Sequence, residues 1–193
     1  MVRPQHLIAA LILLAAPPQV AVAQSYDVNQ TLAQNDIHLE VTRDTSYPGE
    51  PYYVRGSVII DAAPERIWAV MTDCEATEQI VPQLRHCEVE MEGNGWDHRR
   101  HDMRSGPFRI SSVFRSDYEP LKSITISKVS GDLEVQEGSW TLTPRQDGSV
   151  ELRYEAWSKP KIWVPRWFIS RSVKRDAPKI LANLKSMAER TSG

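Results

Sequence analysis

Short stretches in which apolar and polar residues alternate follow one another along most of the chain. The first two cover residues 37–41 and 53–61. Further stretches of this kind lie at residues 86–91, 96–104, 108–118, 124–126, 140–142 and 150–154. Because successive side chains of a strand point to opposite faces, this period of two predicts β-strands. The Asn94-Gly95 and Asp147-Gly148 pairs predict tight turns between neighbouring strands, so the pattern indicates an antiparallel meander.

Helical signals interrupt the strands once and then close the chain. Pro64, in the first turn after Ala63, predicts a short helix, and a second short helix at residues 75–81 is stopped by Pro82. A long helix is predicted from near Pro165 to about Arg190, because apolar residues recur there at helical spacing. Its apolar stripe consists of Ile169, Val173, Ile180, Leu184 and Met187. Pro178 is expected to kink this helix or to restart it.

These elements predict an α+β architecture of the helix-grip kind. A curved antiparallel sheet, with two short helices after its early strands, buries its apolar face by wrapping around the long C-terminal helix. A sheet wrapped around a helix in this way encloses an internal space. The positions predicted to face inward include the small residues Gly56, Ser112 and Gly138, which either leave a cavity or mark bulges and bends of the sheet.

The first residues have the pattern of a secretory signal peptide. Arg3 precedes an apolar run at residues 7–16, and Ala21-Val22-Ala23 supplies small residues at the usual cleavage spacing. The run is too short for a permanent membrane anchor. We therefore expect residues 1–23 to be removed near Ala23 and the protein to be exported, to a periplasm or outside the cell. Residues 24–36 are then a loose lead-in, and residues 37–190 are the ligand-binding domain.

The composition restricts the classes of partner that the protein can bind. The chain has 23 basic and 25 acidic residues. This balance, together with export, argues against nucleic acid as a partner. The length fits one domain, which we expect to be monomeric.

The two cysteines, Cys74 and Cys87, either form a disulfide in an oxidising compartment or remain separate buried thiols.

Two segments carry a family resemblance. They are VRGSVIIDAAPERIWAVMTDCEATEQIVPQLRHCEV and SGDLEVQEGSWTLTP. With the closing helix, they resemble the polyketide cyclase/dehydrase and coenzyme Q-binding START-type family, within the wider SRPBCC (Bet v 1-like, lipid-transfer) superfamily. The resemblance covers roughly residues 37–190 and depends mainly on Pro64, Trp68, Asp73, Pro82, Gly131, Asp132, Gly138 and Trp140. It implies a helix-grip fold whose cavity binds a quinone, lipid or polyketide, or cyclises a substrate. The chain departs from the family pattern at Cys74, where an aromatic residue is common, and in the polar strand at 97–104.

That polar strand, DHRRHDMR, contains the only clustered candidates for site chemistry. Alternation places His98 and His101 on opposite faces, so they cannot chelate one metal ion together. One face carries Trp96, His98, Arg100 and Asp102, and the other carries Arg99, His101 and Met103. The set that points inward brings an imidazole and a guanidinium to the cavity, where they could orient a polar head group or polarise a carbonyl. The alternative is a solvated strand with ion pairs to Glu88, Glu90 and Glu92.

The candidate ligand-binding residues are therefore Trp96, Arg100, His101, Met103, Phe114 and Trp140. Neither a Ser-His-Asp arrangement nor a glycine-rich phosphate loop is present in the sequence. We accordingly name no catalytic residue and expect no metal and no cofactor. The leading hypothesis is an exported carrier of a hydrophobic small molecule, such as a lipid, quinone or isoprenoid. An aromatase or cyclase acting on a polyketide-like substrate is the alternative.

A basic and aromatic segment, KPKIWVPRWFISRSVKR, precedes and opens the last helix. Its 17 residues include six Lys or Arg and no acid. Four-residue steps place Trp167, Arg171 and Arg175 on one helix face, away from the apolar stripe. Indoles beside cations suit the surface of an anionic membrane. The candidate docking residues are Trp163, Trp167, Phe168, Arg171 and Arg175. The alternatives are a solvated helix face or a module that binds a protein partner.

Overall fold

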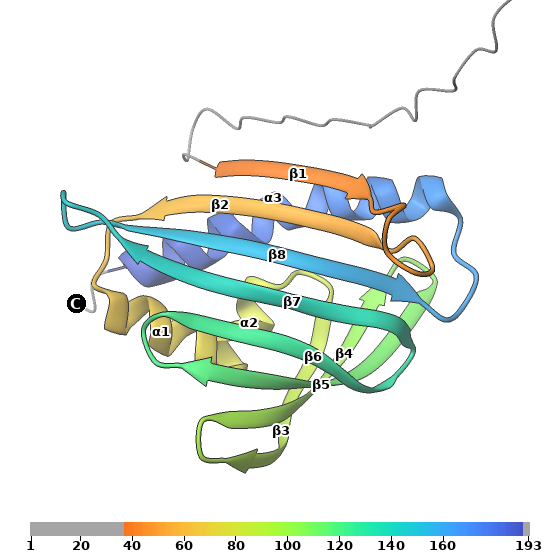
Figure 1. The fold of residues 1–193 in the computed structure, drawn as a ribbon, viewed down its shortest axis with the longest axis horizontal. Helices are drawn as coiled ribbons and strands as arrows, with labels where there is room; N and C mark the ends of the chain where they lie inside the picture. Colours follow the sequence, from red (N-terminus) through yellow and green to blue (C-terminus); the bar gives the residue numbers. More distant parts are fainter. Residues whose placement is uncertain (1–36, 191–193) are drawn as a thin grey trace, which may run out of the picture.

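The computed structural model describes residues 37–190, which form a curved antiparallel sheet, two short helices and one long helix (Figure 1). The expected signal peptide at 1–23 and lead-in at 24–36 lie outside the described residues. The strands are β1 (Ile37–Arg43), β2 (Tyr52–Ile60), β3 (Leu84–Gly93), β4 (Trp96–Ser105), β5 (Phe108–Glu119), β6 (Ser123–Gly131), β7 (Leu133–Pro144) and β8 (Val150–Pro160). The helices are α1 (Pro64–Thr72), α2 (Cys74–Ile80) and α3 (Arg166–Glu189).

The eight strands form one sheet in the order β1-β2-β8-β7-β6-β5-β4-β3. Strands β3 to β8 follow one another as a meander of hairpins, and the last of them returns to pair with β2. Helices α1 and α2 carry the chain from β2 to the opposite edge of the sheet, where β3 begins. The predicted helix-grip fold is thus confirmed, with α3 packed along the face of β1 and β2 (Figure 1).

The core lies between one half of the sheet and the C-terminal part of α3. In β2, the buried residues Val54, Val58 and Ile60 alternate with more exposed neighbours, as a sheet with one covered face requires. Val54 packs with Leu39 and Val41 of β1, whereas Val58 and Ile60 pack with residues of β8, α1, α2 and α3 that are almost fully buried. These partners include Leu152, Ile67, Ile80, Leu181 and Leu184.

Helix α3 runs without interruption through Pro178, so the predicted restart at this proline is wrong. A proline inside a helix removes one backbone hydrogen bond. Pro178 itself is buried, and Leu181 and Leu184 in the following turn are 2% and 3% exposed. Burial of this face offsets the lost hydrogen bond and keeps the helix in one piece.

Cys74 and Cys87 form a disulfide that connects the first residue of α2 to β3. Of the two alternatives left open by the sequence, the bonded pair is therefore the one observed. The Glu78 side chain of α2 also accepts a hydrogen bond from the Cys87 backbone N–H, at 2.7 Å. Together these contacts fix α2 against the edge strand of the sheet.

Among residues 37–190, no helix is both long and apolar enough to cross a membrane.

Candidate functional site

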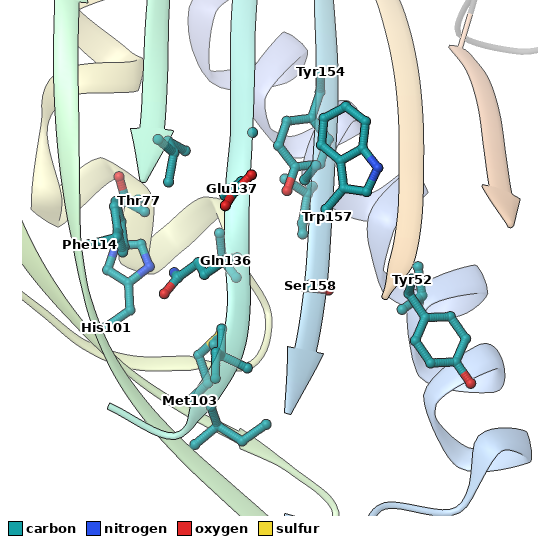
Figure 2. Close-up of a pocket in the computed structure, with 18 of the residues that line it drawn as sticks. Tyr52, Thr77, His101, Met103, Phe114, Gln136, Glu137, Tyr154, Trp157 and Ser158 are labelled. Carbon is teal, nitrogen blue, oxygen red and sulfur yellow. The ribbon is translucent and has the colours of Figure 1, made fainter. Parts of the chain in front are cut away.

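An internal cavity of about 430 Å³ lies between the concave face of the sheet and the helices α2 and α3 (Figure 2). Strands β4 to β8 supply most of its wall, and their contribution is largely aliphatic and aromatic. The sheet side includes Phe108, Ile110, Phe114, Ile124, Ile126 and Trp140. The helical side includes Ile80, Ile169, Val173 and Ile180. A volume of this size and polarity suits a mostly apolar small molecule.

Of the small residues predicted on the inward face, only Gly138 lines the cavity directly. A Cβ on Gly138 would fall 2.5 Å from the Glu155 carbonyl oxygen of the neighbouring strand β8, so the glycine allows the two strands to lie this close together. Gly56 and Ser112 are buried outside the lining, Gly56 against α3 and Ser112 within the sheet.

Strand β4 turns Arg99, His101 and Met103 into the cavity. The structure places Trp96 and Arg100 on the opposite face, which corrects the prediction that they line the cavity. Arg100 there forms an ion pair with Glu90 of β3, as the solvated-strand alternative proposed. The guanidinium of Arg115 lies over Trp96, with its central carbon 4.3 Å from the centre of the indole ring.

A hydrogen-bonded network allows the charged part of β4 to be buried. Arg99 donates from Nε to Asp97 Oδ2 at 2.8 Å and from Nη2 to the backbone carbonyl of Thr72 in α1. The Tyr118 hydroxyl donates to the same Asp97 oxygen at 2.5 Å. Burial and the hydrogen bond to Asp97 raise the pKa of Tyr118 to about 12. The charges of Asp97 and Arg99 compensate each other, so this end of the cavity is polar without a net charge.

His101 lies on the cavity wall in its neutral form. Burial, reinforced by the positive charge of Arg99, lowers the pKa of His101 to about 4. The imidazole meets Phe114 edge to face with ring centres 4.7 Å apart. Its Nε2 is buried and has no hydrogen-bond partner among the described residues. The structure thus places His101, Met103, Phe114 and Trp140 on the wall, and their contact with a ligand stays a prediction.

Gln136 and Tyr154 are among the polar residues of the wall that were not predicted from the sequence. Tyr154 stacks on Trp140 with ring centres 4.3 Å apart, and burial raises the pKa of Tyr154 to about 12. Gln136 shares the parity of Gly138 and Trp140 along β7, so the alternation of this strand could have placed it on the inward face.

At the other end of the cavity, the segment before α3 and its first turn contribute Val164 and Phe168 to the wall. Their sequence neighbours Trp163 and Trp167 are 82% and 70% exposed. Two unusually exposed indoles therefore stand beside this end of the cavity, which we call the tryptophan rim (Trp163 and Trp167). Phe168 contacts Phe108 inside the cavity, with ring centres 4.9 Å apart, which corrects its placement among the outward docking residues.

The cations of α3 differ in their surroundings. Arg171 and Arg175 are both exposed, as the four-residue spacing predicted. Arg175, however, forms a bidentate ion pair with the buried Asp176, with both contacts at 2.7 Å. Because the carboxylate compensates its charge, Arg175 offers less attraction to an external anion than Arg171 does.

Within residues 37–190, no three His, Cys, Asp or Glu side chains are grouped closely enough to hold a metal ion.

The fold and the cavity define the class of this molecule as a helix-grip protein with an internal apolar chamber. The sequence matches the family model described as polyketide cyclase/dehydrase and lipid transport over residues 60–185. The chain therefore belongs to this family, within the START-like superfamily. Both activities in that description concern hydrophobic small molecules or their precursors. None of the curated proteins matches the sequence.

Solved structures share the fold at low sequence identity. A STAR-related lipid transfer protein from Xanthomonas axonopodis is 20% identical, with a TM-score of 0.66 over 80% of this chain and 94% of that one. The Zhui aromatase/cyclase from a Streptomyces species is 18% identical, with a TM-score of 0.63 over 72% and 93%. A START superfamily protein from Mycobacterium smegmatis is 20% identical, with a TM-score of 0.59 over 71% and 97%. These likenesses concern the fold alone.

Proposed function

We propose that this protein is an exported carrier that holds a hydrophobic small molecule, such as a lipid, quinone or isoprenoid, in its internal cavity. The observation that carries the proposal is the apolar chamber of about 430 Å³ between the sheet and α3. Each methylene of a ligand that is buried there contributes about 0.8 kcal/mol, so a modest tail suffices for useful affinity. The lipid-transport part of the family description supports the same reading.

We further propose that the carrier exchanges its ligand at a membrane surface through the tryptophan rim. Trp163 and Trp167 are exposed, whereas their neighbours Val164 and Phe168 line the cavity. A bilayer that received the two indoles at head-group level would therefore lie against this end of the chamber. Arg171, which follows Trp167 by four residues on the helix, would face anionic head groups.

Native mass spectrometry of the protein purified from its own host tests the carrier proposal. We expect a co-purifying hydrophobic molecule that is lost in the variant Ala156→Phe, because Ala156 lines the cavity and the larger ring fills it. Ala69→Phe, at an exposed position of α1, is the matched control and should keep the molecule. Equal occupancy in the wild type and Ala156→Phe would contradict the proposal, as would a wild-type protein that never carries a ligand.

One observation favours the enzymatic alternative, an aromatase or cyclase for a polyketide-like substrate. The neutral imidazole of His101 lies on the cavity wall, where it could accept a proton from a bound substrate. If the protein is a cyclase, a poly-ketone substrate should lose the mass of water in its presence, and His101→Phe should abolish the loss. A carrier would release the same substrate unchanged.

A further inference from the structure

Two polar side chains of the cavity wall, His101 and Gln136, lie next to a third, Ser112, which is buried behind the wall. His101 of β4 is paired in register with Ser112 of β5. Gln136 of β7 donates a hydrogen bond from Nε2 to Ser112 Oγ at 3.4 Å. His101 and Gln136 thus flank the same serine, and Figure 2 shows the imidazole and the amide turned toward one another on the cavity wall.

Two atoms of this site are buried without a partner among the described residues. They are Nε2 of His101 and Oε1 of Gln136. Buried polar atoms are nearly always hydrogen-bonded, because leaving one unpaired is unfavourable. Apolar side chains such as Met103 and Phe114 complete the surrounding wall. The two unpaired atoms therefore indicate a place that a polar group of the ligand completes.

The chemistry of the two atoms restricts that group. The Gln136 oxygen accepts only, so the ligand must offer a proton donor. Nε2 of the neutral imidazole either donates or accepts, depending on which ring nitrogen carries the hydrogen. A hydroxyl group donates its one proton to the Gln136 oxygen and accepts from Nε2–H, so it pairs with both atoms in the tautomer whose hydrogen is on Nε2.

Other head groups fit less well. A carboxylate accepts only and would face the Gln136 oxygen without a proton between them. The nearest cation on the same strand face, Arg99, is already paired with Asp97 and with the Thr72 carbonyl. An ether offers no donor, and a ketone offers none either, so both leave the Gln136 oxygen unpaired.

We infer that His101 and Gln136, whose amide is held by Ser112, form a binding site for the hydroxyl group of a long-chain or isoprenoid alcohol. The tail of this alcohol lies along the apolar wall of the chamber. The inference rests on the proposed carrier function and specifies the chemical class of its ligand.

Calorimetric titration with matched probes tests the inference. Tetradecanol, tetradecyl methyl ether, 2-tetradecanone and tetradecanoic acid share a tail and differ in the head group, and farnesol with its methyl ether repeats the comparison for a branched tail. We expect each alcohol to bind about tenfold more tightly than its ether, the typical value of a buried hydrogen bond to a neutral group. The ketone and the acid should bind no better than the ether.

Gln136→Leu should lower the affinity for the alcohols to the level of the ethers and leave the ethers unaffected. Met103→Leu is the matched control, because Met103 lines the same cavity without the hydrogen bonds; it should shift alcohol and ether together and preserve their ratio. The comparison of probes on the wild-type protein does not depend on any variant folding.

The outcomes separate the two proposals. Equal binding of alcohol and ether, as expected if trapped water completes the site, overturns the hydroxyl inference and leaves the carrier function intact. Tightest binding of the acid or the ketone also overturns the inference, in favour of an accepting head group. If none of the probes binds, both the inference and the carrier function are contradicted.

Discussion

Leu181 of α3 packs directly against the backbone of Gly56 in β2. A Cβ on Gly56 would lie 2.9 Å from Leu181 Cδ1 and 3.4 Å from Leu39 Cδ1, so glycine is what allows the helix to approach the sheet this closely. Gly56→Val should therefore overpack the core and lower the free energy of unfolding by about 1–3 kcal/mol, and Gly56→Ala should cost less. Urea unfolding followed by circular dichroism measures both values.

The neighbouring substitution Ser57→Val, on the other face of β2, is the control and should have little effect. Because the strain arises at the contact with Leu181, replacing this leucine with a smaller residue should relieve the strain. The double variant Gly56→Val/Leu181→Ala should lose less stability than the sum of the single variants. Strict additivity would show that the two residues do not press on each other.

His101 makes the stability of the protein depend on acid pH. Its pKa is about 4 in the folded state against a reference of 6.5, so the unfolded chain binds the proton more readily. The stabilisation is complete above pH 6.5 and is lost as the pH falls toward 4, by about 3 kcal/mol. His101→Phe should remove this dependence. Urea midpoints of both proteins between pH 7 and about 4 measure the difference, from which other titrating groups cancel.

Parallel pH curves for the wild type and His101→Phe would mean that the imidazole is not held neutral by burial. A co-purified ligand that binds the wild type but not the His101 variant would also change the measured stability. Both proteins are therefore freed of lipid by extraction and refolding before the measurement.

The hydrogen bond from Tyr118 to the buried Asp97 should contribute to stability. Tyr118→Phe removes a donor from a carboxylate whose other oxygen already has no partner among the described residues. We expect a loss of about 1–3 kcal/mol in the free energy of unfolding. Tyr154→Phe is a close control, because Tyr154 also lines the cavity but forms no side-chain hydrogen bond within residues 37–190. Equal costs for the two substitutions would contradict the role of the Tyr118 hydroxyl.

The disulfide between Cys74 and Cys87 should stabilise the fold by restricting the unfolded chain. The two residues are 13 positions apart, and closing a loop of this length is worth about 3 kcal/mol in the chain-entropy model. The double variant Cys74→Ala/Cys87→Ala should lose about that amount in urea unfolding. Dithiothreitol should destabilise the wild type and leave the double variant unchanged. A wild type that is insensitive to reductant would show that the bond is not formed in solution.

Local periodicity was sufficient to predict the elements and their assembly into a helix grip. The alternation in β2 and the three- and four-residue steps in α3 are properties of neighbouring residues, and they dictate which faces are covered. The outward face of α3 followed from the same reasoning, since Trp167 and Arg171 are one turn apart and both are exposed.

The face of β4 that points inward could not be predicted in this way. Alternation divides the strand into two sets but does not say which set is buried. The choice depends on partners that are distant in sequence, because Arg99 is buried only where Tyr118 and the Thr72 carbonyl complete its network with Asp97. Of the two tryptophans predicted to line the cavity, Trp140 does so, whereas Trp96 packs under Arg115 on the outer face of the sheet.

The tryptophan rim and Arg171 lead to a prediction about membranes. Indoles at head-group level and uncompensated cations both favour an anionic bilayer, so the wild type should sediment with liposomes of phosphatidylglycerol and phosphatidylcholine more than with phosphatidylcholine alone. Trp163→Ala/Trp167→Ala should weaken this binding at least several-fold. Arg171→Gln should weaken it more than Arg175→Gln, because Arg175 is already paired with Asp176.

Exposed apolar residues elsewhere provide the control for the liposome experiment. Met91 and Val129 are 55% and 45% exposed, and Met91→Ala/Val129→Ala should bind liposomes like the wild type. Added salt should weaken the contribution of Arg171 and spare that of the indoles, since only the charge interaction is screened. If the rim variant and the control sediment equally, the rim does not dock on lipid. If the tryptophan rim bound a protein partner and not lipid, the segment would be a protein-interaction surface. The cavity would then exchange its ligand by another route.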